Sequence, residues 1–384
     1  MIGSWFRPVA HLSDPAGIVQ SAAPAIRILA ILREIRMKVG IFDHVERASD
    51  RPMAQTLDER LKFAAAADEA GIYCLHIAEH HATPLNLVPV PGVYLGAVAR
   101  ATKRMRLGPL CYLLPLYSPL RLAEEICILD HLSNGRLEIG VGRGVSPYEL
   151  AYHKIAHADS REIFIDAFNC MTTALRSEKF SYAGKHYTYK DVPMALRPLQ
   201  QPMPAFWYGS SNTTGATWSG EHGMHFVANG PTDYAKVNID AYREALAKRG
   251  APEQPKPEFK NGAAIGALRH IVVAETDEEA RKLAKPNVDY HVGSLNWLRK
   301  QHAQNDAQVR GLVPRGMTFE EWEKDGMAIA GSPKTVLAEI ERQADKLGLN
   351  YLLTYLFFGN LTLEQALRSL ELMRTEVMPK LEKM

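Results

Sequence analysis

From residue 37 onward, short apolar runs alternate with longer stretches in which apolar residues recur every three or four positions. The short runs are typical of buried strands and the longer ones of amphipathic helices. Eight strands are predicted, at 38–44, 72–78, 105–114, 137–142, 205–210, 225–229, 264–274 and 350–358. The principal helices are predicted at 57–71, 93–103, 120–132, 161–177, 234–250, 332–348 and 362–383.

This alternation predicts a parallel sheet, because a helix between two strands returns the chain to the same end of the sheet. A closed (β/α)8 TIM barrel and a doubly wound open sheet both fit. The open sheet usually carries a glycine-rich nucleotide loop after its first strand, but no glycine follows residues 38–44 until Gly71. The sequence therefore predicts a single α/β barrel, with catalytic groups at the carboxyl ends of its strands.

Three segments fall outside the regular alternation. Residues 179–204, rich in Tyr, Pro and Gly, predict a β-hairpin followed by a loop. Residues 277 to about 328 predict a partly helical insertion, the longest of the chain, interrupted at Pro286 and Gly293. Residues 1–36 are rich in Pro, Ala and Ser, and we expect them to be an extension outside a barrel domain of residues 37–384.

Composition narrows the class of protein. The formal net charge is only +2, which argues against binding nucleic acid or an anionic membrane surface. No stretch approaches the roughly 20 apolar residues of a membrane helix. The four cysteines include no CxxC pair, so they predict reduced thiols in a cytoplasmic protein.

The sequence AEHH (78–81) places a carboxylate and two histidines at the end of the second predicted strand. Because strand side chains alternate, His80 shares the face of His76 and Ala78 and should point into the barrel mouth. Glu79 and His81 should share the opposite face. A histidine in that position can act as a general acid or base, and the alternative is a hydrogen-bonded structural strand end.

No metal site is predicted. HExxH and HxH spacings are absent around AEHH. The pairs His153/His157 and His222/His225 have ligand-like spacing but no suitable carboxylate, so they are interpreted as solvated histidines.

Two further stretches follow predicted strands and indicate an anion site. EIGVGRGVSP (138–147) combines glycines, which permit close backbone approach, with Arg143, which could bind a phosphate; a tight turn with a surface arginine is the alternative. YGSSNTTGATW (208–218) places hydroxyl groups at the start of a helix, where backbone N–H groups are free. The alternative for this second stretch is a simple helix cap.

Together, AEHH, WYGSS (207–211) and residues 108–144 (GPLCYLLPLYSPLRLAEEICILDHLSNGRLEIGVGRG) resemble the bacterial luciferase-like family of flavin-dependent oxidoreductases. The resemblance covers about residues 37–383. It implies a TIM barrel with its late insertion near the active-site mouth, and a homodimer that pairs near helices 93–103 and 120–132. It also implies FMN, used in reduced form and delivered by a separate flavin reductase, or a deazaflavin in its place.

The same resemblance assigns residues to the flavin ring. His80 matches the histidine implicated in flavin–oxygen chemistry, and Glu79 matches an acidic neighbour at the flavin site. Leu110 and Cys111 match a non-proline cis peptide beneath the ring. Gly142 stands where light-emitting luciferases have a reactive cysteine, so light emission is not expected.

The resemblance also assigns the FMN phosphate to the two anion stretches. Arg143 matches the arginine on the phosphate. The phosphate-binding loop follows the fifth strand and contains Gly209, Ser210, Ser211 and Thr214.

The leading functional prediction is an FMN-dependent monooxygenase that uses O2 to oxygenate a small organic substrate. The alternatives are a deazaflavin- or NAD(P)H-linked reductase on the same barrel, a flavin-binding relative without turnover, and a metal-dependent barrel hydrolase. The sequence does not identify the substrate. Five aromatic residues of the insertions predict either an apolar pocket wall or a dimer contact: Tyr182, Tyr187, Tyr189, Trp297 and Trp322.

Overall fold

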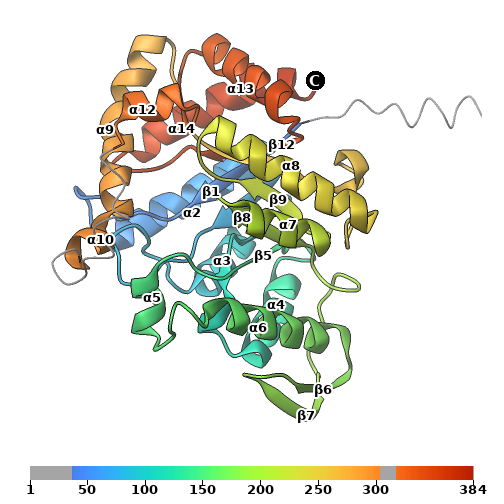
Figure 1. Cartoon of the computed structure of the whole chain (residues 1–384). Coiled ribbons are helices and arrows are strands. Elements are labelled where there is room, and N and C mark those ends of the chain that lie inside the picture. Colours follow the sequence, from blue (N-terminus) through green and yellow to red (C-terminus); the bar gives the residue numbers. More distant parts are fainter. Residues whose placement is uncertain (1–36, 303–316, 384) are drawn as a thin grey trace, which may run out of the picture. The chain divides into compact units, whose positions relative to one another are not determined.

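The computed structural model describes residues 37–302 and 317–383. Within them, ten parallel strands form one sheet in the order β3-β2-β1-β12-β10-β9-β8-β5-β4, with β11 paired to β10 (Figure 1). The strands are β1 (Lys38–Asp43), β2 (Cys74–Ile77), β3 (Arg106–Pro109), β4 (Tyr112–Leu113), β5 (Ile139–Gly142), β8 (Phe206–Ser210), β9 (His225–Ala228), β10 (Ile265–Val273), β11 (Ala328–Gly331) and β12 (Tyr351–Tyr355).

The sheet closes on itself between β3 and the segment that leads into β5. Leu107 donates its N–H to the Arg136 carbonyl at 3.1 Å and accepts the N–H of Glu138 at 2.9 Å. These bonds join β3, at one end of the order, to the segment before β5, next to the other end, and the predicted TIM barrel is confirmed. Its strands are short and buried, as barrel strands packed against both interior and helices should be.

Helices surround the barrel and begin with recognisable start signals. Proline stands in the first turn of five of them, and Thr362 with Gln365 forms a reciprocal capping box. The helices are α2 (Met53–Glu69), α3 (Pro91–Ala101), α4 (Pro119–Leu132), α5 (Pro147–Tyr152), α6 (Ser160–Arg176), α7 (Thr213–Glu221), α8 (Thr232–Arg249), α9 (Asp277–Leu295), α10 (Trp297–His302), α12 (Phe319–Lys324), α13 (Pro333–Leu347), α14 (Leu363–Leu372) and α15 (Met378–Leu381).

A buried ionic cluster closes the amino end of the barrel. The Glu138 carboxylate accepts hydrogen bonds from Lys256 at 2.8 Å and from the Trp207 indole at 2.7 Å, and it also pairs with Arg106. Burial alone would raise the pKa of Glu138, but the two cations lower it to about 2. The amino end of a TIM barrel serves stability, so this cluster is structural.

The predicted hairpin is present, whereas three other expectations need correction. β6 (Lys179–Ala183) and β7 (Thr188–Pro193) pair antiparallel, as predicted. The strand predicted at 105–114 is broken between β3 and β4 by a cis peptide at Leu110–Cys111, the bond that the resemblance implied. β11 was missed, because its four residues, AIAG, are too few to carry a periodic signal.

The third correction concerns the late insertion. Helix α9 continues through Pro286 and Gly293, where an interruption was predicted. One face of the helix is buried, including Ala284, Val288 and His291, and this packing outweighs the low local helix propensity. Ion pairs from α9 to α12, Arg281–Glu323 and Lys285–Glu320, join the described parts of the insertion. The predicted extension, residues 1–36, lies outside the described residues.

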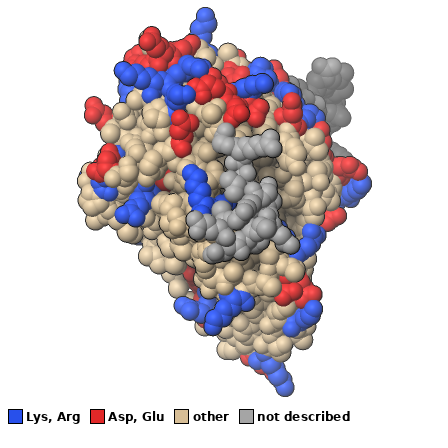
Figure 2. Space-filling model, turned by 60° about the vertical axis from the view of Figure 1, so that its left-hand side comes forward, with Lys and Arg blue, Asp and Glu red and all other residues tan. Residues whose placement is uncertain are grey.

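The surface fits the nearly balanced charge. On the face in Figure 2, acidic and basic side chains are interspersed at the top of the view. Among the described helices, none combines the length and the apolar character needed to cross a lipid bilayer.

Candidate active site

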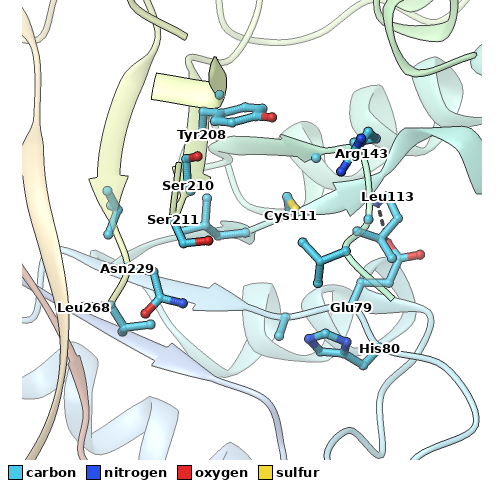
Figure 3. Close-up of a pocket in the computed structure, with 18 of the residues that line it drawn as sticks. Glu79, His80, Cys111, Leu113, Arg143, Tyr208, Ser210, Ser211, Asn229 and Leu268 are labelled. Carbon is cyan, nitrogen blue, oxygen red and sulfur yellow. Dashed lines mark hydrogen bonds between the residues drawn. The ribbon is translucent and has the colours of Figure 1, made fainter. Parts of the chain in front are cut away.

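A cavity of about 600 Å³ opens at the carboxyl ends of the barrel strands, where the sequence placed the catalytic groups. A volume of this size suits a small-molecule or cofactor site. All nine residues predicted for the site line this one cavity: Glu79, His80, Leu110, Cys111, Arg143, Gly209, Ser210, Ser211 and Thr214. In Figure 3, Arg143 and Tyr208 lie at the top of the view, Cys111 at the centre, and His80 and Leu268 at the bottom.

One side of the cavity presents cationic and hydroxyl groups. Arg143 follows β5 and makes no ion pair within the part of the chain that the structure describes. Arg161, at the start of α6, also lines the cavity. Burial raises the pKa of Tyr208 to about 12, although the charges of Arg143 and Arg161 act to lower it. We call this side the arginine wall; it comprises Arg143, Arg161, Tyr208, Ser210, Ser211 and Thr214.

The amino end of α7 forms part of the arginine wall. Asn212 caps this helix by accepting the Gly215 N–H at 2.9 Å. Ser210 supports the cap, because its hydroxyl accepts the Asn212 N–H at 3.1 Å and donates to the Asn212 carbonyl at 2.9 Å. Capping is therefore done by Asn212 with Ser210, and Ser211 and Thr214 line the cavity without serving as the cap.

The glycines of β5 have a more specific purpose than the sequence suggested. A Cβ on Gly140 would overlap the backbone of Pro109 and Leu110, and a Cβ on Gly142 would overlap the Sγ of Cys111. These glycines therefore make room for the cis peptide segment of β3 and β4. Burial raises the pKa of the Cys111 thiol to about 12, so the thiol is protonated at the floor of the cavity.

Glu79 lies at the cavity, although strict strand alternation placed it on the opposite face. Strand β2 ends at Ile77, so the alternation does not extend to residue 79. The Glu79 carboxylate accepts hydrogen bonds from the Leu113 N–H at 3.1 Å and the Tyr117 hydroxyl at 2.9 Å, and lies 2.9 Å from the His81 ring. Burial raises the pKa of the Glu79 carboxyl group, and the interactions with these partners offset part of that rise.

His80 points into the cavity, as predicted, although β2 ends at Ile77 and strand alternation alone does not place it there. It is held by a residue that the sequence analysis missed. Its Nδ1 atom lies 3.1 Å from Oε1 of Glu149, a buried carboxylate on α5. Burial would raise the pKa of Glu149, but the hydrogen bond and charge of His80 lower it below its usual value. The only local signal for Glu149 was the Ser-Pro start of its short helix.

The opposite side of the cavity consists of stacked rings. We call it the ring wall and define it by six buried residues: Phe42, His44, His270, His291, Trp322 and Tyr355. Tyr355 stacks on His44 with ring centroids 5.4 Å apart and on His270 at 4.1 Å. His80 stacks in turn on His44 at 5.2 Å. Of the ring wall, the sequence analysis had singled out only Trp322.

Other candidate residues lie away from the cavity. Trp297 lines a second hollow beside Arg47 and Tyr290, while Tyr182 and Tyr189 pair across the β6–β7 hairpin. His153 and His157 are exposed, as predicted. His225 is buried on β9 and its Nδ1 accepts the Ala264 N–H, so its interpretation as solvated was wrong. No cluster suited to a metal ion occurs within the described ranges.

The fold and site belong to a known class. A family model described as luciferase-like monooxygenase matches residues 37–351. The chain therefore belongs to the luciferase-like monooxygenase family. This confirms the family and the enzyme class that the sequence motifs predicted.

Individual relatives extend the comparison. The uncharacterized protein y4wF of Sinorhizobium fredii is 34% identical over 343 residues, 89% of this chain and 97% of that protein. The oxygenase component of a flavin-dependent trigonelline monooxygenase of Acinetobacter baylyi is 26% identical over 285 residues, 72% of this chain and 76% of that protein. The oxygenating constituent of 3,6-diketocamphane monooxygenase of Pseudomonas putida, solved in complex with FMN, shares the fold with a TM-score of 0.73 and 24% identity, over 90% of this chain and 98% of that chain.

Proposed function

We propose that this chain is the oxygenase component of a two-component monooxygenase, which takes reduced FMN from a separate reductase and oxygenates a small organic substrate with O2. One observation carries the proposal: a single cavity joins an arginine wall, suited to a phosphate, to a histidine held by an ionised carboxylate. Membership of the luciferase-like family and the relatives named as flavin-dependent oxygenases support it.

The residues present fit FMN. Arg143 has no ion-pair partner among the described residues, and the amino end of α7 adds helix-dipole attraction for an anion. Gly209, Ser210, Ser211 and Thr214 would complete the phosphate site, and Glu79, Leu110 and Cys111 would contact the ring system. When bound, reduced FMN supplies the electrons with which one atom of O2 enters the substrate and the other leaves as water.

His80 is the proposed catalytic acid or base. An ionised carboxylate at Nδ1 keeps the proton on that nitrogen, so Nε2 is the atom that can accept or return a proton at the cavity. Glu149 is a positioning residue, because it reaches the chemistry only through His80. Its second oxygen accepts the His81 N–H at 3.0 Å, which also fixes the backbone of the strand end.

The proposal is tested with purified protein and chemically reduced FMN. Binding of FMN should be saturable, and O2 uptake should depend on the reduced flavin. His80→Ala should keep FMN affinity within a few-fold but lose roughly 100-fold or more of product formation, releasing hydrogen peroxide instead. His81→Ala is the matched control, because its ring pairs with Glu79, and it should lower thermal stability more than turnover. Binding and reduction of a deazaflavin without O2 uptake would instead favour the reductase.

We also propose a homodimer that pairs through α3 and α4. Both helices carry exposed apolar side chains there, Val93 on α3 and Ile128 and Leu132 on α4. Light scattering at micromolar concentration should give the mass of two chains; a monomer mass contradicts the proposal.

The cytoplasm is the proposed location, since all four cysteines are free thiols. We also propose that residues 1–36 lie outside the functional domain, because the family match begins at residue 37. A chain that starts at Met37 should therefore remain soluble and bind FMN. Loss of FMN binding in that shortened chain contradicts this part of the proposal.

A further inference from the structure

Four of the six ring-wall residues lie on or directly after three neighbouring strands, β1, β12 and β10, and the other two, His291 and Trp322, lie on α9 and α12. β2, β1, β12 and β10 are adjacent in the sheet, and each directs alternate side chains into the cavity. The inward pairs at or just beyond their carboxyl ends are Ala78 and His80, Phe42 and His44, Leu353 and Tyr355, and Leu268 and His270. His270 and Tyr355 are direct partners in the β10–β12 register, which explains why their rings stack. The wall is therefore a continuous aromatic surface imposed by the barrel.

Five of the six ring-wall residues carry no charge, and the sixth, His291, is paired with the Glu46 carboxylate. Burial lowers the pKa of both His44 and His270 well below the usual range, and neighbouring histidines lower it further. Phe42, Trp322 and Tyr355 are neutral side chains, and Tyr355 is engaged by His44 through its hydroxyl. The arginines that line the cavity within the described ranges, Arg143 and Arg161, belong to the other wall.

Behind the ring wall lies a negative charge. Glu46 is buried, accepts the Gly359 N–H at 2.9 Å and lies 3.2 Å from Nδ1 of His291. Burial opposes its ionisation, but His291 and the other hydrogen bonds outweigh burial and lower the pKa. His291 lines the cavity and Glu46 lies behind it, so the pair adds no net positive charge to the ring wall. An anionic ligand there would lose its hydration without gaining an uncompensated cation.

We propose that the ring wall is the substrate subsite and that it takes a planar aromatic ring without negative charge. The inference rests on the proposed function only in assigning the arginine wall to the flavin. Aromatic ligands gain from offset stacking and edge-to-face contacts with the wall beyond the area that they bury. Carboxylate substrates are excluded by the charge arrangement, and saturated rings of the same size lose the ring–ring contacts.

Three probes of nearly equal size separate the effect of negative charge from the effect of ring–ring contacts. Naphthalene-2-carboxamide is aromatic and neutral, naphthalene-2-carboxylate is aromatic and anionic, and decalin-2-carboxamide is neutral and saturated. Ligand-observed NMR titration of the full chain, with and without saturating FMN, gives their dissociation constants. We expect the aromatic amide to bind at least about tenfold tighter than the carboxylate. It should bind roughly 2- to 12-fold tighter than the saturated amide.

Two variants locate the binding. Trp322→Leu should reduce the preference for the aromatic amide over the saturated one toward unity. Trp297→Leu, on the same insertion but 38% exposed and lining the second hollow, is the matched control and should change neither affinity. Glu46→Gln should relax the discrimination against the carboxylate by several-fold.

The outcomes decide the inference separately from the proposed function. Tighter binding of the carboxylate or of the saturated amide, or no binding of the three probes, overturns the substrate class. Competitive displacement of the aromatic amide by FMN shows that the ring wall belongs to the flavin subsite and also overturns it. If the protein binds no FMN, the proposed function fails, while the probe ranking on the flavin-free protein still tests the ring wall.

Discussion

The Nδ1 atom of His80 lies 3.1 Å from Oε1 of Glu149, and Oε2 of the same carboxylate accepts the backbone N–H of His81 at 3.0 Å. A single side chain on α5 thus fixes both the ring and the backbone at the end of β2. Because Glu149 is buried beside these partners, the geometry does not depend on solvent. Helix α5 and the end of β2 therefore fix the position of His80 in the cavity together.

Glu149→Gln should lower turnover roughly tenfold to hundredfold, since the amide no longer enforces the proton on Nδ1. FMN affinity should stay within a few-fold, and Glu149→Asp should recover part of the activity. Steady-state kinetics of the single and double variants provide the measurement. In the His80→Ala background, the same substitution should have little further effect; an additive loss would mean that Glu149 acts independently of His80.

Arg143→Ala should weaken FMN about tenfold to hundredfold, because a charge-assisted contact is worth about 1.5–3 kcal/mol. Riboflavin, which lacks the phosphate, should bind the variant and the parent protein alike. Fluorescence titration of both ligands makes the comparison. Equal losses for FMN and riboflavin would show that Arg143 acts through the fold.

Gly142→Ala should destabilise the protein by about 1–3 kcal/mol, because the new methyl group would overlap the Cys111 sulfur. Adding Cys111→Ala should recover most of that loss. Gly96→Ala is the control, since a Cβ at Gly96 has open space within 4 Å. Urea unfolding of the set checks the relationship, and a double variant no more stable than Gly142→Ala refutes it.

Glu138→Gln should cost about 3–5 kcal/mol at pH 7, because Arg106 and Lys256 would remain buried without their carboxylate. The folded-state pKa of Glu138 is about 2, below the usual 4.5. Its contribution is therefore complete above pH 4.5 and is lost as the pH falls toward 2. Urea unfolding at several pH values should show a shallower acid dependence for the variant; identical dependence contradicts the assignment.

The barrel was predictable because its strands and helices have separate periodicities and its helices carry local start signals. The hydrophobic periodicity could not predict where tertiary packing extends, interrupts or adds an element. β11 is too short to give a signal, and α9 is helical through Pro286 because its buried face holds it. The break between β3 and β4 came from the family resemblance and not from the hydrophobic pattern.

The predicted half of the site consists of residues in contiguous motifs. Arg143, Ser210 and His80 each lie at or just beyond the carboxyl end of a strand, in stretches whose residue types already indicated chemistry. Glu149 and Glu46 act only through histidines that are distant in the sequence, so no local pattern marked them. The roles assigned to the nine cavity residues remain predictions until the variants are measured.

The two walls of the cavity come from different arcs of the barrel, β5 and β8 on one side and β2, β1, β12 and β10 on the other. Among the described residues of the insertion, His291 of α9 and Trp322 of α12 belong to the ring wall. The strands and the insertion that form the ring wall can therefore vary while the strands that carry the arginine wall stay the same. Substitutions that change the substrate preference can then arise in the ring wall without changing the residues of the arginine wall.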